Sequence, residues 1–242
     1  MKTTLYSLLL ASTLISTPAA ITQPIITHEK SIPLEQLVKE DYKTKKAFDK
    51  SSIHLSEEQQ INIPFELISS IIPKTELTYK LSDILTNSGY TVKKEGNIYK
   101  VKAYDNSVSD LIIKYQKLNK DNFQTLYYLT GTRSFGDFEA ILHLNYQRAK
   151  QNTSTYQVDI HVRPKKWLTR VGLAIGTHTP ILRTKIQSYF QSETEYITKA
   201  GIKTFEIIFK QPQQTINTMK NNKEIFTNKD IQYMKETYNK LK

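Results

Sequence analysis

The segment from Thr155 to Ala200 constrains the fold more than any other part of the chain. It begins with apolar and polar residues in strict alternation. The apolar set is Tyr156, Val158, Ile160 and Val162, and the polar set is Gln157, Asp159, His161 and Arg163. This period of two predicts a strand with one face on a core and the other in solvent. Pro164 ends the strand, because proline has no N–H for the next ladder bond.

The longest helical pattern in the chain follows this strand, from Pro180 to Ala200. The residues of its inward face are Leu182, Ile186, Tyr189, Phe190, Glu193 and Ile197. Their spacing predicts a helix that packs along its whole length. Gly201 then occupies the position after the last helical residue, where glycine commonly ends a helix. The upstream chain must supply the surface against which this strand and helix pack.

The composition fits one domain with extensions. The chain has 242 residues, of which 38% are hydrophobic and 24% charged, so the core is lean for this length. Tyr and Phe, with 15 and 9 residues, supply much of its bulk.

Residues 1–20 have the features of a secretory signal peptide. Lys2 gives a positive start, an apolar run follows from Leu5 to Ile15, and Ala20 offers a cleavage site. The alternative is a membrane anchor, but the apolar run is about half of the ~20 residues that a span needs. The chain has no Cys, which suits a bacterial periplasm. We therefore expect a periplasmic or secreted protein.

Three further regions follow the signal peptide. Residues 21–51 form an N-terminal extension with a marginal helix and a solvated, Lys-rich part from Lys39 to Lys50. Residues 52–210 form the main domain: a strand, two short helices, a meander of about five or six antiparallel strands, and the long helix. Residues 211–242 form a polar, peripheral tail with a short helix.

This order of elements resembles the SRPBCC superfamily, the START and Bet v 1-like helix-grip group. The likeness lies in the segment 60–68 (QINIPFELI), the hairpin at 90–99 (YTVKKEGNIY), and the strand and helix from Thr155 to Ala200. It covers about residues 52–200. The resemblance implies an α+β fold in which a curved antiparallel sheet wraps around a long C-terminal helix. It departs from the family in the long basic connection between Pro164 and Pro180.

The resemblance also implies an apolar cavity between sheet and helix. The candidate lining residues are Phe138, Leu142, Leu144, Tyr146, Val158, Ile160, Leu182, Ile186 and Phe190. Each of them could instead fill an ordinary core.

The chain is strongly basic, with a formal net charge of +11, which favours anionic partners. One cluster surrounds its single Trp: Arg163, Lys165, Lys166, Trp167 and Arg170. An aromatic residue flanked by cations before an apolar run is typical of a membrane-surface contact. The alternative is a solvated basic loop with Trp167 in the core. An anionic membrane surface is thus a candidate partner, and we expect no nucleic-acid partner for an exported chain.

The sequence gives little support for catalysis. The five His show no metal-ligand spacing on one helix, and no phosphate-binding or nucleophile motif occurs. Asp159 and His161 could form an acid–base pair, but the solvent face of a strand is the favoured interpretation. We predict no cofactor and no metal site.

Three functions remain open. The first is an exported, monomeric protein that binds or transfers an apolar molecule, with a lipid as the expected ligand. The second is an enzyme of the same fold, cyclase- or hydrolase-like, with Tyr128, His143 or Arg133 as candidate groups. The third is a protein-interaction module without a cavity.

Overall fold

A computed structural model of the chain describes residues 31–133, 136–150, 152–165 and 180–241. The side chains of Arg133, Gly136, residues 180–186 and Tyr189 lie outside this description. The predicted signal peptide lies outside it as well.

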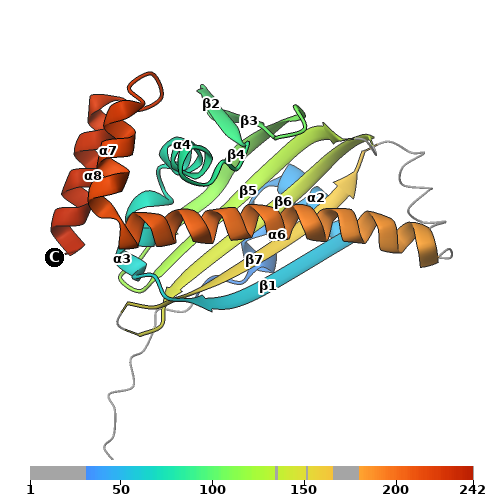
Figure 1. Cartoon of the computed structure of the whole chain (residues 1–242). Helices are drawn as coiled ribbons and strands as arrows, with labels where there is room; N and C mark the ends of the chain where they lie inside the picture. The colour runs from blue at the N-terminus through green and yellow to red at the C-terminus, as the bar shows by residue number, and fades with distance from the viewer. Residues whose placement is uncertain (1–30, 134–135, 151, 166–179, 242) are drawn as a thin grey trace, which may run out of the picture.

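Seven antiparallel strands form one curved sheet in the order β1-β7-β6-β5-β4-β3-β2 (Figure 1). Their bounds are β1 Ile53–Ile61, β2 Thr91–Glu95, β3 Ile98–Lys102, β4 Val108–Leu118, β5 Asn122–Arg133, β6 Gly136–Arg148 and β7 Ser154–Pro164. The first strand pairs with the last, so residues 53–61 lie beside residues 154–162. The β4–β5 register shifts between Ile113 and Tyr115, and such irregularities bend a sheet.

The long helix α6, Pro180–Lys210, lies across one face of this sheet (Figure 1). Two shorter helices, α3 (Phe65–Ile71) and α4 (Thr75–Thr86), follow β1 and support the same face. Apolar side chains from the sheet, these helices and α6 form the main core. The predicted α+β helix-grip fold, with two short helices after the first strand, is confirmed.

The sequence indicated a helix end at Gly201, but helix α6 does not end there. It continues through Thr204 and Phe205, both buried, to Lys210. Gly201 therefore has a helical conformation, not the left-handed one of a helix-ending glycine. The local signal was misleading because a glycine inside a long helix and one just after a helix end have the same neighbours in sequence.

The C-terminal residues are not a peripheral tail. Helices α7 (Pro212–Asn221) and α8 (Asn228–Leu241) pack at one end of the sheet, beside α3 (Figure 1). They bury Ile216, Met219, Phe226, Ile231 and Met234 in the main core. These apolar residues are few and widely spaced between polar ones, which is why the segment looked solvated.

The N-terminal extension also belongs to the folded body. Helix α1 (Leu34–Leu37), the 3-10 turn η1 (Val38–Glu40) and helix α2 (Tyr42–Asp49) cover the sheet face opposite α6. Their buried side chains meet Leu126, Tyr128 and Ile141 of the sheet. The Lys-rich part was expected to be solvated, but Thr44 and Ala47 are fully buried. Both are small, so the inward face of α2 gave little hydropathic signal.

As a result, the polar face of β7 is not exposed to solvent. Asp159, His161 and Arg163 are all buried beneath or beside the N-terminal segment, which corrects the expectation of an outward, wet face. Asp41 holds α2 in place: its carboxylate accepts hydrogen bonds from Thr44 N at 2.8 Å and from Lys114 Nζ of β4 at 3.1 Å. Hydrogen bonding from Thr44 lowers the pKa of Asp41 to about 2.

Candidate ligand-binding cavity

A cavity of about 190 Å³ lies between the curved face of the sheet and the helices α4 and α6. Its floor comes from five strands and the turn into α4. These floor residues are Ile61, Ile72, Leu111, Tyr127, Leu142, Leu144, Tyr146, Tyr156, Val158 and Ile160. The cavity-free interaction module proposed from the sequence is therefore wrong.

The helices supply small and hydroxylated side chains to the roof. From α4 come Thr75, Thr78, Tyr79 and Ser82, and from α6 come Thr194, Ile197, Thr198, Gly201, Ile202 and Phe205. On α4 these positions are three, four and seven residues apart, so they share one face of the helix. Ile197 is 44% exposed and marks the side where the cavity meets solvent.

The cavity exists because α6 cannot follow the curvature of the sheet. Leu142, Leu144 and Ile160 lie beneath the helix, yet they are only partly buried. Gly201 widens the gap, since a Cβ atom built there would meet no atom within 4 Å. A straight helix over a bent sheet with a missing side chain at the centre leaves unfilled space.

None of the described lining residues carries a formal charge. The polar groups are hydroxyls, and burial raises the pKa of the phenols of Tyr79, Tyr127 and Tyr146, so all three are neutral. The hydroxyl of Thr75 is buried beside the phenol of Tyr127. Hydroxyl groups both donate and accept hydrogen bonds, so this wall can hydrogen-bond to an uncharged ligand group.

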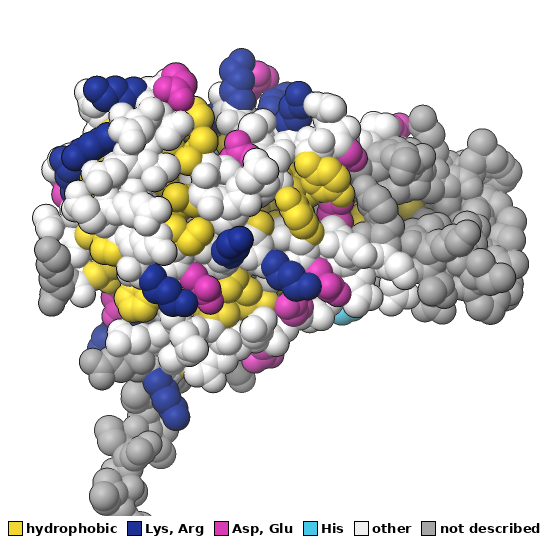
Figure 2. Space-filling view, in the orientation of Figure 1, with side chains coloured by type: hydrophobic (Ala, Val, Ile, Leu, Met, Phe, Trp, Pro, Cys, Tyr) yellow, Lys and Arg dark blue, Asp and Glu magenta, His cyan; other side chains and the backbone are white. Residues whose placement is uncertain are grey.

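Three tyrosine hydroxyls form hydrogen bonds that hold helix α6 in place at the exposed side of the cavity. Tyr90 Oη donates to Glu193 Oε1 at 2.6 Å, and Tyr104 Oη donates to Glu193 Oε2 at 3.3 Å. Tyr196 Oη donates to the carbonyl of Ser88 at 3.1 Å. In Figure 2, apolar side chains are visible in the surface between the charged groups on this side of the molecule.

Five of the nine predicted lining residues line this cavity: Leu142, Leu144, Tyr146, Val158 and Ile160. Phe138 and Phe190 instead belong to a separate apolar cluster with Ile53, Ala140 and Val162 on the same face. The side chains of Leu182 and Ile186 lie outside the described residues. The contribution of α4 to the cavity was not predicted. The row of hydroxyl-bearing residues at 75, 78, 79 and 82 on one face of this helix could have indicated it.

The candidate membrane cluster is described only in part. Arg163 is buried and its Nη1 lies 2.6 Å from Glu139 Oε2, so its guanidinium forms an internal ion pair with Glu139. Lys165 is more exposed, and its Nζ lies 3.8 Å from Glu139 Oε1. Lys166, Trp167 and Arg170 lie outside the described residues. No described helix is both apolar enough and long enough to traverse a lipid bilayer.

Of the candidate groups for an enzyme, Tyr128 and His143 do not line the cavity. Tyr128 packs under the N-terminal helices, and its hydroxyl donates to Glu139 Oε1 at 2.8 Å. His143 lies on that same opposite face, in contact with Asp159. The side chain of Arg133 is outside the description. Among the described residues, no group of three or more His, Asp or Glu is arranged to hold a metal ion.

Comparison of the sequence with protein-family models finds no match, and comparison with curated proteins finds no similar sequence. Solved structures with a similar fold include a START superfamily protein from Mycobacterium smegmatis, with 14% identity and a TM-score of 0.45; the match covers 64% of this chain and 98% of that one. A hypothetical protein from Helicobacter pylori matches with 6% identity and a TM-score of 0.44, over 64% of this chain and 88% of that one. The structure titled Ara h 8.0201 matches with 16% identity and a TM-score of 0.38, over 58% and 98%. At these identities and TM-scores the function has to be argued from the cavity itself.

Proposed function

We propose that this protein binds an uncharged, mainly apolar molecule between its sheet and helix α6. The observation that carries the proposal is the cavity of about 190 Å³ whose described lining holds no charged residue. An ionic group placed there would lose its hydration without gaining a counter-ion. An apolar ligand would bury the exposed parts of Leu142, Leu144 and Ile160, which favours binding by the hydrophobic effect.

The size of the cavity limits the ligand further. A cavity of about 150 Å³ holds one benzene molecule, so the preformed space accepts roughly eight non-hydrogen atoms by the same scale. A lipid can therefore place one chain end in the cavity while the rest leaves past Ile197. Transfer of lipid in a bacterial envelope, with cleavage of the signal peptide before residue 21, is the physiological form of this proposal.

The test uses three probes that carry one benzene ring and match the size of the cavity: toluene, p-cresol and benzoate. We expect the hydrocarbon and the phenol to bind, because the lining offers apolar surface and hydroxyl partners. The benzoate should bind at least about tenfold more weakly, since no described lining residue can pair with its carboxylate. Binding is measured by titration calorimetry and by protein NMR shifts.

A pair of variants on α6 locates the site. Gly201→Phe puts a ring into the empty space and should abolish binding. Lys199→Phe adds the same ring two residues away, on a side chain that is 76% exposed, and should leave binding unchanged. Equal affinity of the two variants, or preference for the benzoate, would contradict the proposal.

A further inference from the structure

A second pocket lies on the other face of the sheet. Its volume is about 300 Å³, and it is bounded by residues 31–35 on one side and by strands β1, β5, β6 and β7 on the other. Because side chains alternate along a strand, β7 serves both sites. Val158 and Ile160 line the apolar cavity, whereas Asp159 and His161 line this polar pocket.

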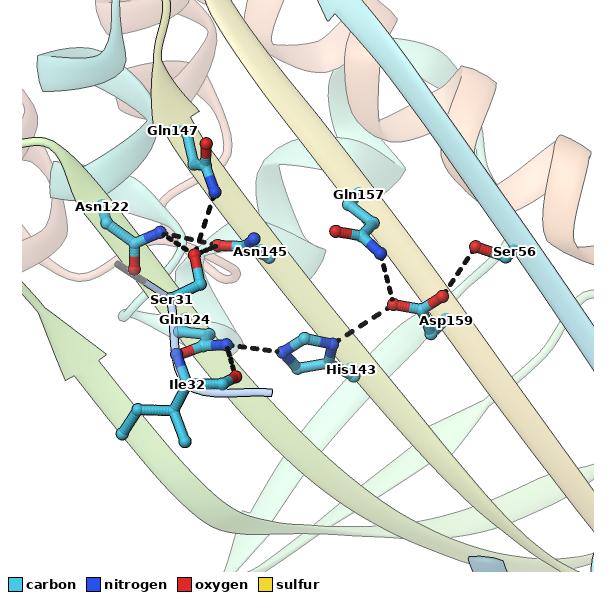
Figure 3. Close-up of polar contacts among 10 residues, drawn as sticks. All are labelled: Ser31, Ile32, Ser56, Asn122, Gln124, His143, Asn145, Gln147, Gln157 and Asp159. Atoms are coloured by element: carbon cyan, nitrogen blue, oxygen red, sulfur yellow. Dashed lines mark hydrogen bonds and ion pairs between the residues drawn. The ribbon is translucent and has the colours of Figure 1, made fainter. Parts of the chain in front are cut away.

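The floor of the polar pocket is buried and hydrogen-bonded (Figure 3). Asp159 is its centre: its carboxylate accepts from Ser56 Oγ at 2.6 Å, Gln157 Nε2 at 3.0 Å and His143 Nδ1 at 3.3 Å. These donors come from three neighbouring strands, and all three point at one carboxylate. Burial raises the pKa of Asp159, but the hydrogen bonds from His143 and Ser56 outweigh this effect and leave the pKa below its usual value, so Asp159 is ionised at neutral pH.

The tautomer of His143 follows from its neighbours. Gln124 Nε2 donates to the carbonyl of Ile32 at 2.6 Å while Gln124 Oε1 accepts from Ile32 N at 3.2 Å, which fixes the orientation of the amide. The same Nε2 lies 3.0 Å from His143 Nε2. An amide nitrogen can only donate, so His143 Nε2 accepts and Nδ1 carries the proton toward Asp159. The hydrogen bonds therefore assign to His143 the tautomer with its proton on Nδ1.

The second imidazole of the pocket belongs to His161 and is neutral. His161 is buried, its ring stacks on His54 with centroids 4.1 Å apart, and its Nδ1 lies 3.3 Å from Ser51 Oγ. Burial, followed by the charge of His54, lowers the pKa of His161 to about 4, although Asp159 and Glu35 act in the opposite direction. The pocket thus has two carboxylates, from Asp159 and Glu35, that the imidazole of His161 does not neutralise.

The negative charge of this pocket contrasts with the positive net charge of the chain. The chain as a whole has a net charge of +11, yet no Lys or Arg is among the described residues that line the pocket. A concave site that carries carboxylates, with no Lys or Arg among its described lining residues, attracts positive ligands and repels anions. By the scale on which about 150 Å³ holds benzene, the pocket has room for roughly twelve non-hydrogen atoms.

We propose that this polar pocket binds a small organic cation that carries a primary ammonium group. Such a group has three N–H donors, and Asp159, Glu35 and Gln157 of the pocket lining carry oxygen acceptors for it. The proposal is independent of the apolar ligand, because the two sites lie on opposite faces of the sheet. Gly201→Phe should accordingly leave cation binding unchanged.

The test compares three four-carbon molecules by titration calorimetry at pH 7.5 and moderate ionic strength: 1,4-diaminobutane, 1,4-butanediol and succinate. We expect the diamine to bind with a Kd of about 1 mM or tighter, and the diol and the dianion to show no binding in that range. Spermidine, which is longer, should bind at least as tightly as the diamine.

Two variants test the assigned acceptors against a matched control. Glu35→Gln removes the carboxylate at the rim and should weaken diamine binding about tenfold. Asp159→Asn should weaken it at least as much, and its thermal midpoint reports whether the floor remains folded. Glu58→Gln removes an exposed carboxylate from β1, outside the pocket, and should have no effect.

Absence of diamine binding would overturn the proposal. So would equal binding of the diol, or equal affinity in Glu35→Gln and Glu58→Gln, which would indicate general attraction to surface carboxylates. If Asp159→Asn fails to fold, the comparison of Glu35→Gln with Glu58→Gln alone decides the outcome.

Discussion

Replacement of Gly201 by Ala is a direct test of how α6 spans the sheet. Gly201 lies inside the helix, and a Cβ atom at this position would meet no atom within 4 Å. Ala in a helix interior is more favourable than Gly by roughly 0.5–1 kcal/mol, and here no steric cost opposes that gain. We therefore expect Gly201→Ala to raise the free energy of unfolding by roughly this amount.

The effect is large enough to measure. For a domain of this size, 1 kcal/mol corresponds to a shift of about 2–4 °C in the melting temperature. Thermal and urea unfolding, followed by far-UV circular dichroism, would resolve such a shift. Since one methyl group fills little of the cavity, binding of toluene should survive the change.

Gly96 provides the matched control. It lies in the turn between β2 and β3, and a Cβ atom there would also meet nothing within 4 Å, but its φ is +60°. The added methyl group meets no atom at either glycine, so Gly96→Ala differs from Gly201→Ala only in backbone conformation. We expect Gly96→Ala to destabilise the protein by about 1–2 kcal/mol. If Gly201→Ala destabilised the protein like Gly96→Ala, the helix would not be continuous at 201, and the argument for the cavity roof would be refuted.

Three further predictions concern the N-terminal segment and the basic cluster. Asp41→Ala removes the cap of α2 and should cost about 1 kcal/mol in urea unfolding; an unchanged midpoint would show that α2 does not depend on this cap. Because the pKa of His161 is about 4 in the folded state and 6.5 in the unfolded chain, the unfolded state takes up the proton first as pH falls. The free energy of unfolding should thus decrease between pH 6.5 and 4, by at most about 3 kcal/mol. The variant His161→Phe should lose most of this pH dependence, and a wild-type stability that does not change over this range would contradict the lowered pKa of His161. Finally, the protein should float with vesicles that contain anionic lipid, and the triple variant Lys165→Glu/Lys166→Glu/Trp167→Ala should float less; equal flotation would remove this cluster from consideration as a membrane contact.

The sequence predicted the elements whose pattern is local and periodic. Alternation in β6 and β7 assigned Leu142, Leu144, Val158 and Ile160 to one face, and that face lines the cavity. The order of a strand, two helices, a meander and a long helix was sufficient to predict the fold class. The first inference uses only the period of a strand, which neighbouring residues determine. The fold class followed from the resemblance of this element order to helix-grip proteins.

The sequence did not predict which segments cover the second face of the sheet. Alternating polar residues such as Asp159 and His161 look solvated when only their neighbours in sequence are considered. They are buried because residues 31–51, more than a hundred positions away from them, fold over them and form hydrogen bonds with the strands. Satisfied polar groups can be buried at little cost, but hydropathy alone cannot reveal where the partners are.

The chain's own pattern thus determined the strands, the helices and the apolar face that they share. Only the tertiary structure decided that a gap remains under α6, because the gap depends on the curvature of a sheet assembled from distant strands and on one missing side chain at Gly201. The same is true of the polar pocket, where four strands and the N-terminal segment each contribute one part of a network that no single segment of the sequence contains.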